Sequence, residues 1–216
     1  MLKTIITRSC LLSTFSILAM ALILSATQTQ AAEIKAPQAL VEEVTSNVLK
    51  ELSNQKGSAA AVEQAIHKLI LPKLDFDSMA KLVLRDEWKK ANDVQKKNFI
   101  HEFQQLLIGT YSKALVRFSN EVIVFLPFVP GDKPEKLAVV KSEVKSTSGT
   151  KTPIEYKLRF KPEDGWKVYD IDIEGVSLVT NYKGNFAREI SIGGLDHLIV
   201  LLKEQNEKNK ATNSKA

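Results

Sequence analysis

The stretch Gly165–Leu202 reads GWKVYDIDIEGVSLVTNYKGNFAREISIGGLDHLIVLL, and the arrangement of the rest of the chain follows from it. The part before Gly175 predicts a strand, because its apolar side chains recur every two or three residues with polar side chains between them. After Gly175 the apolar spacing changes to three and four residues, which is the period of a helix. Because strand and helix are joined directly, one face of the helix should lie against the sheet that contains the strand. The apolar residues of the strand are Trp166, Tyr169, Ile171 and Ile173, and those of the helix are Val179, Tyr182, Phe186 and Ile190.

Gly193 and Gly194 interrupt the helical pattern. We expect the helix to end there, followed by a turn and a second helix carrying Leu195, Leu198, Ile199 and Leu202. A phosphate-binding loop is not indicated, because no Lys-Ser or Lys-Thr pair follows the two glycines.

Three segments before this stretch also have the patterns of strands. Val122–Phe128 is a continuous apolar run, Leu137–Val144 is largely apolar, and Thr152–Phe160 alternates between apolar and polar residues. With short connections between them, four consecutive strands predict an antiparallel meander. The fold class is therefore α+β, with helices covering one face of a four-stranded sheet.

The first half of the chain predicts helices. Residues 39–52 and 58–70 carry amphipathic stripes, and Asp75 or Asp77 can cap a short helix that follows. Asn92, with Gln95 three residues later, resembles a capping box at the start of a long helix that reaches Phe118.

The first 31 residues have the layout of a cleaved secretory signal peptide. Lys3 and Arg8 precede the apolar run 10–24, and a small, polar segment follows with cleavage expected after Ala31 or alternatively Ala26. The apolar run is short for a bilayer span, which needs about 20 residues. Removal of the leader would also remove Cys10, the single cysteine of the sequence, so neither a disulfide nor a cysteine metal site is expected in the mature chain.

Charge argues against a nucleic-acid partner. The formal net charge of the 216 residues is +5, but part of this excess lies in the leader and part in the lysine-rich end of the chain. The body at 32–204 is close to neutral and offers no basic field for a phosphate backbone. Residues 205–216 are polar and of low complexity, and we expect them to be disordered.

Few residue patterns suggest chemistry. Asp170, Asp172 and Glu174 alternate along the last strand, where they could bind a cation or act in proton transfer, or could simply form its solvated face. The solvated face is favoured, because no histidine or further acid completes a ligand set. His67 and His101 are isolated, and each is expected to be an ordinary packed or surface side chain.

Segments along most of the chain resemble those of a known protein family. Several segments resemble the MlaC family, also called toluene-tolerance proteins, in the same order and over nearly all of residues 36–204. They are the run IEGVSLVTNYKGNFAREISIGGLDHLIVLL, the segment LDFDSMAKLVL, the Trp88-Lys-Lys segment, the Asp93-x-Gln95 helix start followed by Phe99 and Phe103, and Tyr111 near the end of that helix. This resemblance implies a periplasmic phospholipid-binding protein of the pathway that maintains lipid asymmetry. It also implies a curved antiparallel sheet wrapped by about six or seven helices, similar to NTF2-like folds, around a deep apolar pocket.

Such a pocket would enclose acyl tails, while the headgroup could remain in solvent. The expected lining comes from the covered face of the sheet and from the helices above it. The residues are Phe103, Leu106, Val139, Ile154, Tyr156, Leu158, Trp166, Tyr169, Ile171, Val176, Val179 and Phe186. Each of them could instead belong to a packed core, since an alternating strand has the same pattern in both cases.

The family resemblance further implies partners. They are an inner-membrane ABC transporter complex with an MCE-domain protein and an outer-membrane lipoprotein–porin complex, with phospholipid as cargo and no cofactor. Two other functions stay open at this point. One is a small NTF2-like enzyme with Asp170 or Asp172 as base, and the other is an adapter domain with a fully packed core.

Overall fold

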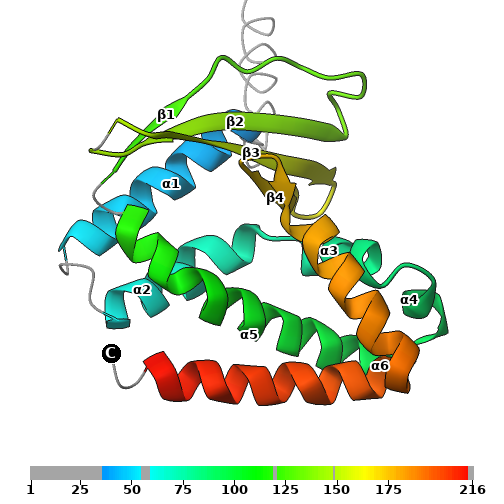
Figure 1. Cartoon of the computed structure of the whole chain (residues 1–216). Coiled ribbons are helices and arrows are strands. Elements are labelled where there is room, and N and C mark those ends of the chain that lie inside the picture. Colours follow the sequence, from blue (N-terminus) through cyan, green and yellow to red (C-terminus); the bar gives the residue numbers. More distant parts are fainter. Residues whose placement is uncertain (1–35, 55–58, 119–120, 148, 214–216) are drawn as a thin grey trace, which may run out of the picture. The chain divides into compact units, whose positions relative to one another are not determined.

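The computed structural model describes residues 36–54, 59–118, 121–147 and 149–213, so the predicted signal peptide lies outside the described residues. Most of the helices precede the strands in the sequence, and one long helix follows them (Figure 1). The helical elements are α1 (Pro37–Asn54), α2 (Ala59–Ala65), the π-helical turn η1 (Ile66–Ile70), the 3₁₀ turn η2 (Leu71–Lys73), α3 (Phe76–Leu84), α4 (Asp86–Lys90), α5 (Asp93–Phe118) and α6 (Leu178–Asn213). The strands are β1 (Val122–Phe125), β2 (Leu137–Lys145), β3 (Lys151–Lys161), β4 (Gly165–Ile173) and β5 (Val176–Ser177).

The strands form one antiparallel sheet in the order β1-β2-β3-β4-β5. The predicted meander is confirmed, but the sheet has five strands instead of four. The additional strand β5 has only two residues, and such a short segment leaves no alternating pattern in the sequence. Gly175, at a φ of 82°, makes the tight turn from β4 into β5. Figure 1 shows the sheet as an open, curved layer with the helices gathered on one side of it.

Local signals in the sequence explain where two helices begin. The amide of Gln95 donates to Oδ1 of Asn92 at 2.9 Å, and the amide of Asn92 donates to Oε1 of Gln95 at 3.1 Å. This is the predicted capping box of α5. Asp75, not Asp77, caps α3 by accepting from the amide of Ser78 at 3.1 Å.

Aromatic side chains fill the layer made by α3, α5 and α6. The rings of Phe99 and Phe103 are stacked with centroids 5.6 Å apart, and Phe186 of α6 meets both rings edge-on. Phe99 and Phe103 are fully buried. This part of the protein is therefore a packed core. Two further clusters of buried side chains lie between α1 and the sheet and among α1, α2 and η1.

The end of the chain is ordered farther than its composition predicts. Gly194, at a φ of 78°, kinks α6 where the turn was expected, and the helix then continues to Asn213. Asn206 is buried, and its side-chain amide donates to the main-chain oxygen of Glu102 at 2.9 Å and to the Glu102 carboxylate at 2.8 Å. Gly109 of α5 lets the two helices α5 and α6 approach closely, because a Cβ at this position would lie 3.0 Å from Nδ2 of Asn209 on α6. The tail was expected to be disordered from residue 205, whereas the structure continues α6 to Asn213, with polar side chains docking this segment on α5.

Candidate functional site

An apolar cavity of about 480 Å³ lies between the covered face of the sheet and the helices α1 and α5. The turns η1 and η2 and the start of α3 close it from a third direction. Its lining is formed by Leu40, Val41, Val44, Thr45, Val48, Leu49, Ile66, Ile70, Leu71, Lys73, Leu74, Phe76, Met79, Leu107, Ile108, Tyr111, Ser112, Ala114, Leu115, Ile123, Val144, Ile154, Tyr156, Val168, Ile171, Ile173 and Leu178.

The polar groups on this lining are few and mostly neutral. Burial raises the pKa of the Tyr156 phenol, and the neighbouring hydroxyls of Ser142 and Thr45 offset this only in part. Burial, together with the neighbouring Tyr182 phenol, raises the pKa of Tyr111 to about 12. Both phenols therefore stay protonated and uncharged at neutral pH. Among the described residues no carboxylate lines the cavity.

A β-bulge decides which side chains of β4 face the cavity. Lys157 of β3 pairs with Asp170, but the next residue, Leu158, pairs with Val168, so Tyr169 is an extra residue in β4. The alternation therefore changes phase at Tyr169. Val168 faces the helices before the bulge, and Ile171 and Ile173 face the same side after it.

Three of the residues expected to line a pocket do line the cavity. Ile154 and Tyr156 come from β3, and Ile171 comes from β4. Leu158 and Trp166 are buried beside it in the cluster between α1 and the sheet.

Four of the remaining residues are buried in the helical layer instead. Val179 and Phe186 on α6 pack there against α5, so the face of α6 that was expected to cover the sheet covers α5 and α3. The other two, on α5 itself, are Phe103 and Leu106.

Three other expected residues do not face the cavity at all. Val139 is 38% exposed, because the buried residues of β2 are at the even positions that include Val140. Because Val139 and Val140 are both valines, hydrophobicity alone does not indicate which of the two side chains faces the helices. Tyr169 is the bulge residue and stacks under the guanidinium of Arg159 at 5.3 Å. Val176 on β5 is 57% exposed.

The helix α1 and the turn η1 also contribute to the lining, although the sequence did not predict it. Val41, Val44 and Val48 were visible as one amphipathic stripe, and Ile66 and Ile70 as another. The periodicity indicated that these faces point into the protein, but it does not show whether they contact other side chains or line a cavity.

Asp170 is not a solvated residue, as the alternation had suggested, but a structural one. It is only 5% exposed, and its carboxylate accepts hydrogen bonds from Lys157 Nζ at 2.9 Å, Ser177 Oγ at 2.8 Å and the Val179 amide at 3.1 Å. It thereby joins β3, β5 and the first turn of α6. Asp172 is half-buried on the same face of the sheet as Asp170, opposite the cavity.

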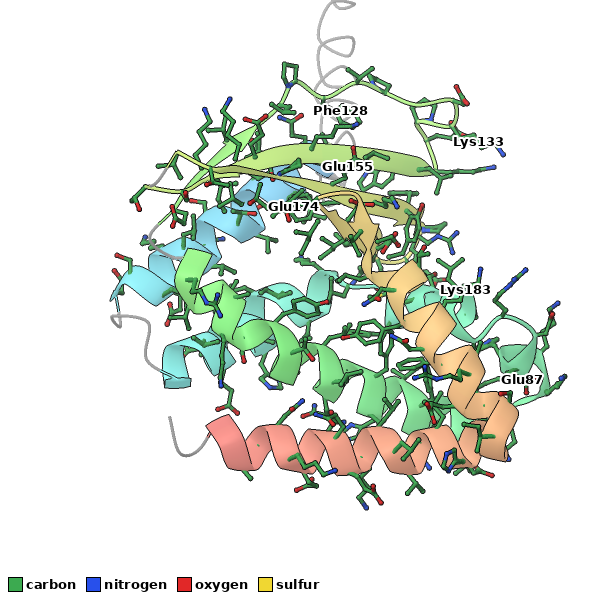
Figure 2. The ribbon with its side chains drawn as sticks, in the orientation of Figure 1. Glu87, Phe128, Lys133, Glu155, Glu174 and Lys183 are labelled. Atoms are coloured by element: carbon green, nitrogen blue, oxygen red, sulfur yellow. The ribbon has the colours of Figure 1, made fainter. Side chains whose placement is uncertain are left out.

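Glu174 is exposed and follows the end of β4, where Figure 2 marks it. In the described part of the chain, no three His, Cys, Asp or Glu side chains come close enough together to hold a metal ion.

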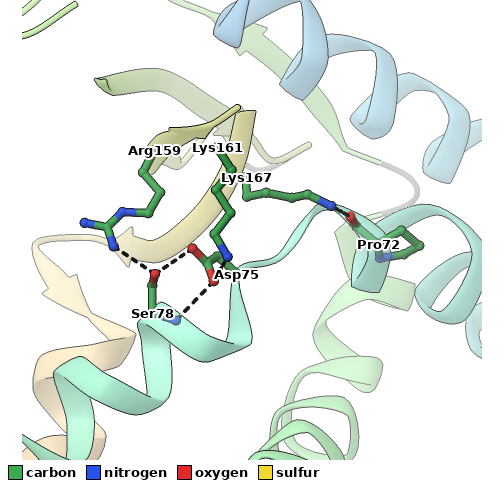
Figure 3. Close-up of polar contacts among 6 residues, drawn as sticks. All are labelled: Pro72, Asp75, Ser78, Arg159, Lys161 and Lys167. Atoms are coloured by element: carbon green, nitrogen blue, oxygen red, sulfur yellow. Dashed lines mark hydrogen bonds and ion pairs between the residues drawn. The ribbon is translucent and has the colours of Figure 1, made fainter. Parts of the chain in front are cut away.

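A second polar cluster fixes α3 and η2 to the other end of the sheet (Figure 3). Asp75 is 3% exposed and accepts from Lys161 Nζ at 2.7 Å and from the hydroxyl of Ser78, which in turn accepts from Arg159. Burial by itself would raise the pKa of Asp75, but the hydrogen bonds from Lys161 and Ser78 lower it below its usual value. The main chain adds a bridge between Leu74 and Val168.

Comparison with known proteins now places this arrangement in a family. The family model described as MlaC protein matches residues 38–204. The chain belongs to the MlaC family. It is 25% identical over 165 residues to the toluene tolerance protein Ttg2D of Pseudomonas putida, with 74% of this chain and 75% of that protein covered. This relationship confirms the resemblance seen in the sequence.

The fold of this MlaC-family chain is also similar to a solved structure. That structure is the phospholipid-binding protein from Ralstonia solanacearum in complex with a phospholipid. The two share 30% sequence identity with a TM-score of 0.72, and the match covers 82% of this chain and 99% of the other. None of the helices in the described part of this chain is both long and apolar enough to cross a bilayer.

Proposed function

We propose that this protein is a phospholipid carrier that holds acyl chains in the cavity between α1, α5 and the sheet. The observation that carries the proposal is an apolar space of about 480 Å³ inside a small domain. Native cores contain few voids larger than a water molecule, so a space of this size is not an accident of packing. Membership of the MlaC family and likeness to a phospholipid-binding protein support the same conclusion.

The size of the cavity sets what it can hold. At about 30 Å³ for each water-sized group, a volume of 480 Å³ holds about 16 methylenes, which is close to one acyl chain. Transfer of that chain from water is worth about 13 kcal/mol at about 0.8 kcal/mol per methylene. A two-chain lipid needs about twice the space, so loading should widen the gap between α1 and the sheet.

The carrier works passively. The chain would take a phospholipid from one membrane complex and release it to another, in the periplasm and in the service of outer-membrane lipid asymmetry. The expected complexes are an inner-membrane ABC transporter with an MCE-domain protein and an outer-membrane lipoprotein–porin assembly. Direction would follow from the difference in lipid affinity between this cavity and the sites of its partners.

Neither alternative function has comparable support. An enzyme with Asp170 or Asp172 as base would need that carboxylate in the cavity, but neither residue lines it. An adapter domain with a solid core would leave no cavity of this size.

The test is lipid extraction from the protein purified after export to a bacterial periplasm. Mass spectrometry of the extract should find phospholipid at about one molecule per chain. Delipidation should then lower the melting temperature by about 5–10 °C, because ligand at 100 times its Kd stabilises by about 2.7 kcal/mol. A lipid-free extract, with a melting temperature that added phospholipid does not change, would refute the proposal.

A further inference from the structure

Lys73 is the one charged side chain among the described residues that line the cavity. It ends η2, directly after Pro72 and before the bridge that Leu74 makes with β4. Its position on the wall is thus set by the main chain on both sides. Every other lining residue is apolar or neutral, so the ammonium of Lys73 stands out chemically.

The nearby carboxylate does not neutralise this ammonium. Asp75 is already bound to Lys161 Nζ at 2.7 Å and to Ser78. Lys167 adds a second ammonium nearby, because its Nζ donates to the main-chain oxygen of Pro72 at 2.7 Å (Figure 3). In the described part of the chain the structure shows no ion pair for Lys73.

Lys73 also marks where the cavity approaches solvent. The residue is half-buried, whereas its neighbour Asp75 is almost fully covered. A lysine on an apolar wall keeps its methylenes on that wall and its ammonium in water, because burial of an unpaired ammonium is costly. The ammonium of Lys73 consequently belongs at the rim of the cavity.

We propose that the ammonium of Lys73 binds the phosphodiester of the carried lipid at this rim. The inference rests on the proposed function and adds a polar anchor to it. The phosphate is common to all phospholipids, so this anchor is compatible with tolerance of different headgroups. It would instead distinguish phospholipids from uncharged lipids with the same two chains, such as diacylglycerol.

The experiment is a competition for the delipidated mature chain. Phosphatidylglycerol and diacylglycerol with identical acyl chains are offered in equal amounts, and bound lipid is measured by mass spectrometry. Wild type should take up both lipids with phosphatidylglycerol enriched. In K73M the enrichment should fall about tenfold while total lipid bound is retained, since a hydrogen bond to a charged group is worth about that factor.

Two variants serve as controls. K73R keeps the positive charge and should keep the enrichment. K68M removes a lysine that is exposed on η1 and is not part of the lining, so it should behave as wild type. Circular dichroism melting curves of all variants confirm that they are folded.

The outcomes separate the two levels of the proposal. Equal enrichment in K73M and wild type would overturn the role of Lys73 while leaving the carrier intact. Uptake of neither lipid by wild type would overturn the carrier itself. Inorganic phosphate alone separates a headgroup anchor from a site for the free anion. It has no acyl chains, and the delipidated wild type should retain no more of it than K73M does. Phosphate retained by the wild type and lost in K73M, together with equal enrichment in the two proteins, would assign Lys73 to a site for free phosphate and overturn the headgroup assignment.

Discussion

Filling the cavity from the wall of β4 should reduce lipid binding without unfolding the protein. The perturbation is Ile171→Trp, at a half-buried residue of the lining. Tryptophan has about six more non-hydrogen atoms than isoleucine, and as bonded ring atoms they add on the order of 60 Å³, the space of about two methylenes at about 30 Å³ for each water-sized group. The space lost corresponds to about 1.6 kcal/mol of transfer free energy at about 0.8 kcal/mol per methylene. Affinity for phospholipid should therefore fall by about tenfold.

The matched control for this variant is Val139→Trp. Val139 lies on the opposite, exposed face of the same sheet, so the same large side chain there leaves the cavity unchanged. Both proteins are delipidated and titrated with phospholipid, and bound lipid and melting temperature are recorded. Lipid affinity of Ile171→Trp equal to that of Val139→Trp would show that the tails do not occupy this cavity.

Three further predictions concern stability and can be checked by chemical denaturation. Asp75→Asn should cost about 2–3 kcal/mol at pH 7, because it leaves the partly exposed Lys161 without its charge partner. Since the folded pKa of Asp75 is lowered, its contribution is present above about pH 4 and is lost as the pH falls, so the variant and wild type should converge in acid. Asn92→Ala should cost about 1 kcal/mol by removing the capping box, and an unchanged denaturation midpoint would contradict that assignment. Gly175→Ala should cost about 1 kcal/mol because of its positive φ, whereas Gly131→Ala, at a position with open space and no positive φ, should be nearly neutral.

Much of the architecture could be predicted because it depends on local patterns. The capping box at Asn92 uses side chains three residues apart, and the break at Gly194 needs a left-handed conformation that glycine adopts easily. The alternation of β3 placed Ile154 and Tyr156 on the covered face. In each case the physical cause lies within a few residues of the chain.

The cavity lining was harder to predict because it depends on relations between distant segments. Tyr169 was assigned to the wrong face because a bulge depends on the register between two strands, which neither strand reveals alone. Val179 and Phe186 have the right period for a buried face, but the tertiary structure places α5 against that face instead of the cavity. The stripe of α1 was recognised as buried, and periodicity cannot show that part of it faces an empty space.

The extra residue at Tyr169 is the point at which β4 could be shortened without turning its side chains over. If Tyr169 were deleted, alternation would run unbroken through the strand, with Val168, Ile171 and Ile173 still toward the helices and Asp170 still opposite Lys157. The contact of the Asp170 carboxylate with the amide of Val179 should then be retained. Deletion of Ile171 instead would bring Asp172 into the apolar interior and turn Ile173 toward water, so the tolerance for a shorter strand should end at the bulge.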